Sequence, residues 1–208
     1  MDRAMDGAEE LTSNGGDDRS GVAGVVDRSR VMDRSRRQEK INRTILLSLL
    51  SSLAVIFFVV ESAIPNPVPW LRLGLANIVV MVAIVFYGAK DGLLVSFLRA
   101  MVGSMIVGTF LGPGFWLSIS GGLASALAMS LMYRLFSPFF SLVGISIVGA
   151  YIHSLVQMLL VFLFLIQRKE IFYLLPVILF SSLITGFING LAATFLVEQL
   201  RKVLSRST

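Results

Sequence analysis

Residues 41–64 read INRTILLSLLSSLAVIFFVVESAI, and residues 65–69 read PNPVP. The first stretch is predominantly apolar and long enough to cross the hydrocarbon core of a bilayer, which takes about 20 residues as a helix. Proline cannot continue a helix, and it also disfavours helical geometry in the residue before it. The stretch therefore predicts a transmembrane helix that ends where the prolines begin.

Five more apolar stretches follow, separated by glycine, proline or charged residues. We place them at residues 73–87, 93–110, 115–136, 142–166 and 172–200. The predicted fold is an all-α integral membrane protein, with a six-helix transmembrane bundle over residues 41–204 in contact with the lipid bilayer.

The charged residues are unevenly placed along the chain. The sequence is 55% hydrophobic and 15% charged, and residues 1–40 hold nine of its 13 acidic residues and eight of its 18 basic ones. Such a polar segment buries too little apolar area to offset its chain entropy, so we expect a disordered cytoplasmic tail over residues 1–40.

The remaining lysines and arginines stand near the ends of apolar stretches, where they act as topology determinants. Ten basic residues fall on the side of the N-terminus, against Arg72, Arg168 and Lys169 on the other side. The positive-inside rule then predicts a multi-pass protein of the cell (plasma) membrane with both termini in the cytoplasm. The same placement argues against nucleic acid as a partner.

Polar side chains within the apolar stretches are the main candidates for function, because polarity in the membrane is costly. The candidate ligand-binding residues are Glu61, Arg72, Asn77, Arg99, His153 and Gln157. In the predicted topology they all fall in the outer half of the bundle or near its midplane. One interpretation is a polar pocket for a small molecule, and the other is a set of interhelical hydrogen bonds with Glu61 neutralising Arg99.

Small residues spaced four apart predict close helix contacts in the membrane. The pairs are Gly186 and Gly190, Gly121 and Ser125, and Ser48 and Ser52. For the first two pairs we expect packing within the bundle.

The sequence offers no set of residues typical of catalysis or metal binding. Residues 41–208 contain a single aspartate, Asp91, and the chain has one histidine and no cysteine. A prenyl diphosphate synthase holds Mg²⁺ with aspartate-rich pairs, since the metal prefers hard oxygen ligands. We therefore expect no catalytic residue, no metal site, no cofactor and no enzymatic activity of this chain alone.

Several segments resemble the "heptaprenyl diphosphate synthase component I" family, also called Gx transporters. These segments are residues 61–65, 69–78, 96–99, 120–123, 153–157 and 183–186. The family pattern has Glu-x-x-Ile-Pro followed by Pro-Gly-x-Lys-Leu-Gly-Leu-Ala-Asn. Here Trp70 replaces the usual glycine and Arg72 the usual lysine, which keeps the charge but changes its geometry.

The family is in turn similar to substrate-binding S components of energy-coupling-factor (ECF) transporters. The resemblance implies a six-helix bundle that binds a small molecule and docks through its first span onto a transmembrane coupling subunit driven by ATPases. The docking residues it implies are Ser48 and Ser52, in place of the alanines common in S components.

Three functions remain open at this point. The first is a substrate-binding membrane subunit for uptake of a small polar or anionic molecule. The second is a non-catalytic membrane subunit of heptaprenyl diphosphate synthase, with a soluble synthase subunit as its partner. The third is a purely structural membrane scaffold.

Overall fold

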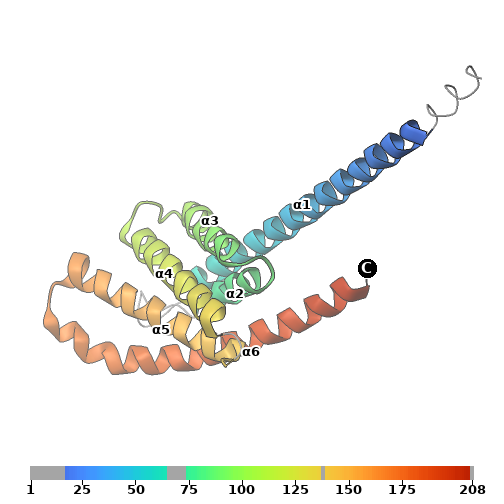
Figure 1. Cartoon of the computed structure of the whole chain (residues 1–208). Helices are drawn as coiled ribbons and strands as arrows, with labels where there is room; N and C mark the ends of the chain where they lie inside the picture. Colours follow the sequence, from blue (N-terminus) through green and yellow to red (C-terminus); the bar gives the residue numbers. More distant parts are fainter. Residues whose placement is uncertain (1–16, 65–73, 137–138, 207–208) are drawn as a thin grey trace, which may run out of the picture. The chain divides into compact units, whose positions relative to one another are not determined.

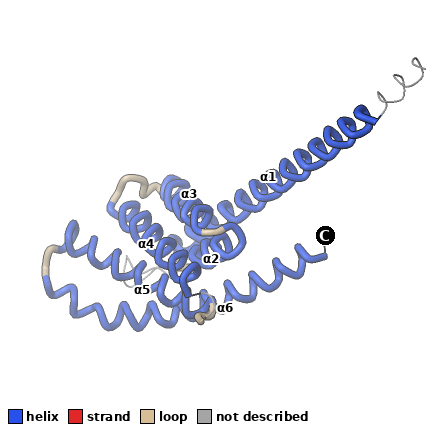
Figure 2. Tube along the Cα trace, in the orientation of Figure 1, coloured by secondary structure: helices blue, strands red, loops and turns tan. Residues whose placement is uncertain are grey.

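The computed structural model describes residues 17–64, 74–136 and 139–206, which form six α-helices (Figures 1 and 2). They are α1 (Asp17–Ala63), α2 (Leu75–Tyr87), α3 (Ala89–Val107), α4 (Pro113–Phe136), α5 (Leu142–Val161) and α6 (Leu175–Arg206). A π-helical turn, Phe162–Ile166, extends α5, and a 3₁₀ turn, Lys169–Leu174, leads into α6. The all-helical, six-helix prediction is confirmed.

Helix α1 begins much earlier than the sequence indicated. The structure describes helix from Asp17, whereas we expected irregular chain up to residue 40. Residues 17–40 contain no proline, and residues such as Arg36, Gln38 and Lys40 favour helix intrinsically. The chain divides into two compact units, Met1–Leu46 and Leu47–Thr208, so residues 17–40 belong entirely to the first unit.

The ends of the other helices follow local sequence signals. Helix α2 stops at Gly88, whose φ of 91° suits only glycine, and α3 ends at Gly108, with a φ of 74°. Helix α4 starts on Pro113, a position where the missing amide proton costs nothing. The Ser141 hydroxyl caps α5 by accepting a hydrogen bond from the Gly144 amide at 3.3 Å.

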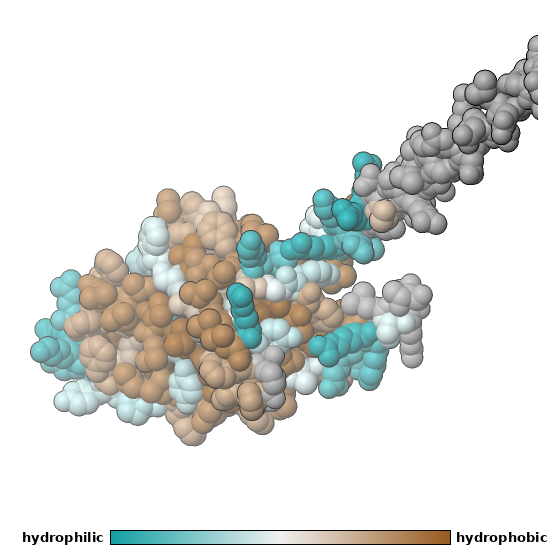
Figure 3. Space-filling view, viewed as in Figure 1, coloured by the Kyte–Doolittle hydropathy of each residue, from teal (hydrophilic) through white to brown (hydrophobic). Residues whose placement is uncertain are grey.

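Within the part of the chain that the structure describes, four helical segments are long and apolar enough to cross a membrane: 36–63, 113–136, 142–166 and 169–203. Their outward surfaces are apolar, as the brown areas in Figure 3 show over the bundle. Helix α2 is shorter, with 13 residues, and α3 carries Lys90, Asp91 and Arg99. The chain is therefore a membrane protein. Two of its six described helices differ from a typical span: α2 is shorter, and α3 carries charged residues.

Helix α2 lies at the centre of the second unit, because it contacts α3, α4, α5 and α6. Its middle, from Val79 to Ile84, is fully buried, as expected for a helix that is apolar on all sides. Helix α1 adds one buried stripe, formed by Leu50, Ala54, Phe58 and Glu61.

The predicted small-residue contacts lie within the bundle, as expected. A methyl group added at Gly186 would lie 2.8 Å from the Ile147 Cα atom, and one at Gly190 would lie 2.6 Å from the Val143 Cα atom. These glycines form the seam between α5 and α6. Gly121 faces side chains of α5, and Ser125 is fully buried close to Gly149.

Candidate ligand-binding site

All six helices contribute residues to one group of mostly polar, buried side chains. A small cavity at its centre is lined by Phe58, Glu61, Gly74, Arg99, Ser118 and His153. These residues lie near the end of α1, before α2, in the middle of α3, near the start of α4 and in the middle of α5. Asn189 adds α6 to the group through its hydrogen bond to Gly74. We call this group, together with Asn77 and Gln157, the polar cluster.

Gly74 ties three helices together through its backbone. Its amide donates a hydrogen bond to the Glu61 carboxylate of α1, and its carbonyl accepts one from Asn189 Nδ2 of α6 at 3.2 Å. The same carbonyl accepts a hydrogen bond from the backbone N–H of Asn77 at 2.8 Å, in the first turn of α2. Gly74 has a φ of 75°, and an added methyl group would lie 3.3 Å from Asn189 Nδ2. The backbone conformation therefore favours glycine here, and a larger residue would also displace the Asn189 side chain slightly.

Arg99 is the buried cation of the cluster, with only 4% of its surface exposed. Its Nη2 atom donates a hydrogen bond to Asn77 Oδ1 at 3.0 Å. The guanidinium lies against α4 at Gly122, where an added methyl group would be 2.8 Å from Nη2. A charge so far from water is stable only when polar groups surround it, and the cluster supplies them.

His153 and Gln157 lie one helical turn apart on α5, and both are buried. Both pack on Gly121 of α4, where an added methyl group would lie 3.0 Å from Gln157 Cγ and 3.2 Å from His153 Cε1. Consecutive glycines at 121 and 122 thus let α4 approach α5 on one side and Arg99 of α3 on the other.

The structure brings together most of the predicted site residues. Glu61, Arg99 and His153 line the cavity itself, and Asn77 bonds Arg99. Gln157 lies beside His153 but does not line the cavity. Arg72 lies outside the described residues.

The candidate site residues predicted from the sequence did not include four members of the cluster: Phe58, Gly74, Ser118 and Asn189. Asn189 stands out as a polar residue within an apolar helix, and Phe58 lies one turn from Glu61 on the same face of α1. Ser118 gave little signal, because serines are common in membrane helices and its hydroxyl bonds the Gly114 carbonyl at 2.7 Å.

The cluster combines one carboxyl group, one guanidinium, three carboxamides and one imidazole. Such a set can bind a small polar molecule through both signs of charge and several hydrogen bonds. Among residues 17–64, 74–136 and 139–206, no three His, Cys, Asp or Glu residues gather as metal ligands would. The cavity is small: its volume of about 10 Å³ has room for about one water molecule.

A larger groove lies beside the cluster, along α4 and the end of α5. It has a volume of about 510 Å³ and is lined by Leu111, Pro113, Trp116, Leu117, Ser120, Leu160, Phe164 and Leu165. All of these except Ser120 are apolar. Leu160 and Phe164 continue the α5 face that carries His153 and Gln157, so the groove begins about one turn beyond the cluster.

Comparison with known families gives a clear match for most of the chain. Residues 50–196, 147 of the 208, match the sequence profile of the family described as "Heptaprenyl diphosphate synthase component I". The chain belongs to this family. A comparison with curated proteins gave no match.

This family member also shares its fold with a solved membrane protein, the S component of a bacterial ECF transporter. The two chains are 18% identical, with a TM-score of 0.56, and the alignment covers 80% of this chain and 97% of the other. The resemblance of the sequence to both families is thereby confirmed, and the second likeness is one of fold.

Proposed function

We propose that this protein is a substrate-binding subunit of the cell membrane that takes up a small polar or anionic molecule. The observation that carries this proposal is the buried Arg99, held by Asn77 and Gly122 beside the cavity that His153 also lines. A bundle needs no buried guanidinium to fold, and well-packed apolar residues often serve stability as well or better. The S-component fold supports the same role.

Arg99 suits an anionic group on the ligand. A guanidinium has five N–H donors in a planar fork, so it can bond Asn77 and a carboxylate or phosphate oxygen at the same time. His153 and Asn189 add groups that can donate hydrogen bonds nearby. Because the cavity holds about one water molecule, a ligand enters only when neighbouring side chains such as Phe58 move aside.

The orientation with both termini in the cytoplasm belongs to the same proposal. It places the polar cluster toward the outer side, since Glu61 and Asn77 flank the connection between α1 and α2. A subunit that captures a molecule from outside needs its site at that end.

A coupling subunit with its ATPases is the proposed partner, docked on the face of α1 that carries Ser48 and Ser52. Both serines are exposed, on the side of α1 opposite Leu50 and Ala54. The Ser52 hydroxyl donates to the Ser48 carbonyl at 2.9 Å, which leaves a small, smooth surface against which another helix can pack.

The proposal is tested by binding and uptake with the full chain. Mass spectrometry of the protein purified in mild detergent identifies retained small molecules, and calorimetry measures their affinity. Arg99→Gln should lower the affinity about 10- to 100-fold, because a hydrogen bond to a charged group contributes about 1.5–3 kcal/mol. Arg201→Gln, an exposed position on α6, is the matched control and should bind as the parent does. Equal binding by both variants would contradict the assignment of the cluster.

The second candidate is a membrane subunit of heptaprenyl diphosphate synthase, and two observations favour it. One is the description of the family, and the other is the apolar groove of about 510 Å³, which could hold part of a prenyl chain. Co-purification separates the two functions: ATPases among the retained proteins support uptake, whereas a soluble prenyl synthase supports the second candidate.

A further inference from the structure

A second pocket of ligand size lies at the opposite end of α4 from the polar cluster. It has a volume of about 540 Å³ and is lined by Ile84, Val85, Tyr87, Gly88, Ala89, Ser130, Tyr133 and Arg134. Ser118 and Ser130 are 12 residues apart on α4, a separation of about 18 Å along the helix. We propose that this pocket, the α2–α3 turn pocket, binds the headgroup of an anionic membrane phospholipid.

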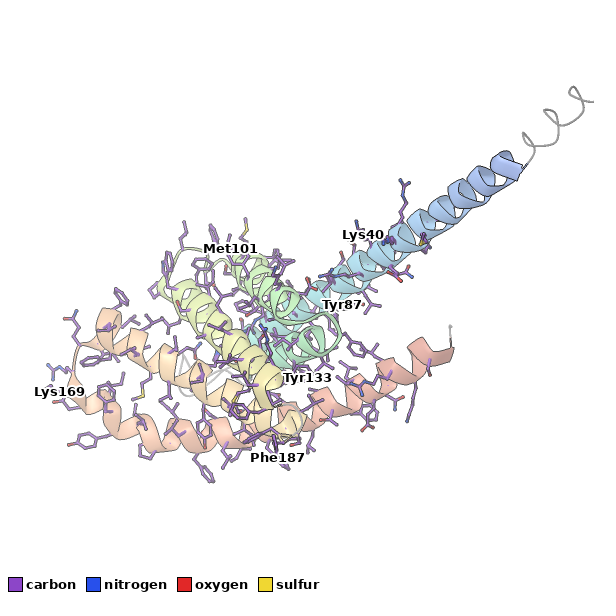
Figure 4. The ribbon with its side chains drawn as sticks, viewed as in Figure 1. Lys40, Tyr87, Met101, Tyr133, Lys169 and Phe187 are labelled. Atoms are coloured by element: carbon purple, nitrogen blue, oxygen red, sulfur yellow. The ribbon has the colours of Figure 1, made fainter. Side chains whose placement is uncertain are left out.

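The lining of the pocket changes from apolar to polar toward its rim. Ile84 is 1% exposed and Val85 is half-buried, so they form an apolar floor. Tyr87 and Tyr133, labelled in Figure 4, are half-buried and bring two phenol rings to the rim. Arg134 is exposed. The apolar floor suits the upper part of the acyl chains, and the phenol hydroxyls suit the ester groups of a phospholipid. The guanidinium at the rim suits the phosphate.

The tight turn between α2 and α3 keeps the pocket open. Gly88 donates its amide to the Ile84 carbonyl at 2.9 Å, and the next helix begins at Ala89 without a connecting loop. No other group lies within 4 Å of where a Gly88 Cβ atom would be. At the turn, the pocket is therefore lined by the small residues Gly88 and Ala89 rather than by a loop that could fill it.

The charge at this end of the bundle is favourable for an anion. Arg134 is the single charged residue that lines the pocket, and Lys90, next to Ala89, is exposed. The one acidic residue of the first turn of α3, Asp91, is 7% exposed and does not line the pocket. A phosphate at the rim would therefore be attracted by the positive charges of Arg134 and Lys90.

A lipid fits this position better than a soluble phosphate. Leu127, Leu131 and Leu135 are exposed along the same helix as Tyr133 and Arg134, and they form part of the surface that faces acyl chains. Tyrosine and arginine side chains at the end of a spanning helix lie at headgroup depth. A lipid can place its phosphate at Arg134 while its chains follow the leucines, whereas a free phosphate would leave the apolar floor unused.

The test measures lipid retention by native mass spectrometry of the full chain. The protein is taken from nanodiscs of phosphatidylcholine doped with phosphatidylglycerol, and the parent should retain phosphatidylglycerol preferentially. Arg134→Gln should weaken this retention about tenfold, since it removes the charge-assisted hydrogen bonds that the guanidinium would make to the phosphate at the pocket. Arg201→Gln removes an exposed arginine elsewhere and should change nothing.

A second variant tests the pocket itself rather than its charge. Ala89→Phe fills the pocket, keeps Arg134 and should also lower retention. Equal retention in Ala89→Phe and the parent would overturn the proposal, as would an equal loss in Arg201→Gln. Displacement of the bound phosphatidylglycerol by soluble glycerol phosphate would show a free-phosphate site instead. A protein retained in place of the lipid would show a docking surface.

Discussion

Glycines serve different purposes at the α5–α6 seam and on α4. At the seam, the positions of Gly186 and Gly190 face backbone atoms of Ile147 and Val143. On α4, Gly121 and Gly122 instead face polar side chains, those of Gln157, His153 and Arg99. The first arrangement brings two helices together, since lipid provides no hydrophobic drive for them to associate. The second makes room for polar groups within the bundle.

The difference determines how each region should respond to an added methyl group. Backbone can yield only if the whole helix moves, whereas the end of an arginine side chain can move by itself. A substitution at the seam should therefore act on stability, and one on α4 should act on the arrangement of the polar cluster.

Gly190→Ala should give the largest loss of stability. Its methyl group would lie 2.6 Å from the Val143 Cα atom, so α5 and α6 must separate. We expect the free energy of unfolding in detergent to fall by about 1–3 kcal/mol, the usual range for overpacking. The control is Gly114→Ala on α4, where nothing lies within 4 Å of the added methyl group. Similar losses of unfolding free energy in both variants would show that the α5–α6 seam tolerates a methyl group as well as an open position does.

Gly74→Ala should have the next largest effect, because it strains the backbone that joins α1, α2 and α6. A left-handed conformation costs a non-glycine residue about 1–2 kcal/mol. Gly108→Ala isolates this cost, since Gly108 has the same left-handed conformation, with φ 74° and ψ 16° against 75° and 23° at Gly74, and no atom lies within 4 Å of its added methyl group. The excess destabilisation of Gly74→Ala over Gly108→Ala measures the crowding against Asn189, and no excess would show that Asn189 moves freely.

Gly122→Ala should have the smallest effect on stability, below about 1 kcal/mol, because only the ends of the Arg99 and Ser96 side chains must shift. It should nevertheless weaken the binding of an anionic ligand about tenfold by moving Nη2 away from Asn77. Thermal unfolding and calorimetry on the same sample separate the two quantities. A loss of stability as large as that of Gly190→Ala would show that α4 glycines are packing residues as well.

Most of the fold could be predicted from the sequence, because helix ends depend on local signals. Gly88, Pro113 and Ser141 mark boundaries that the structure reproduces within a few residues. The start of α1 could not be predicted, since residues 17–40 lack any apolar periodicity and only their modest helix propensity favours helix. The 13-residue length of α2 was close to prediction, but its central position depends on contacts with four other helices.

The polar cluster could be predicted in part. Charged and amide side chains in apolar stretches, such as Glu61 and Arg99, stand out in a membrane sequence. Their partners are decided by three-dimensional packing: Gly74 lies 115 positions from Asn189, and Phe58 meets the cavity only because α1 packs on α3 at Gly103. Spacing along one helix carries no information on such contacts.

The shortness of α2 has a consequence for any charged ligand of the cluster. Thirteen residues extend about 20 Å, against a hydrocarbon core of about 30 Å. When α2 stands along the membrane normal with Tyr87 at one boundary, Leu75 lies about 10 Å below the other. A charge bound there has crossed about a third of the membrane voltage, worth about 0.8 kcal/mol at about 100 mV. Affinity for a charged molecule would then depend on whether the membrane is energised, and for a neutral one it would not.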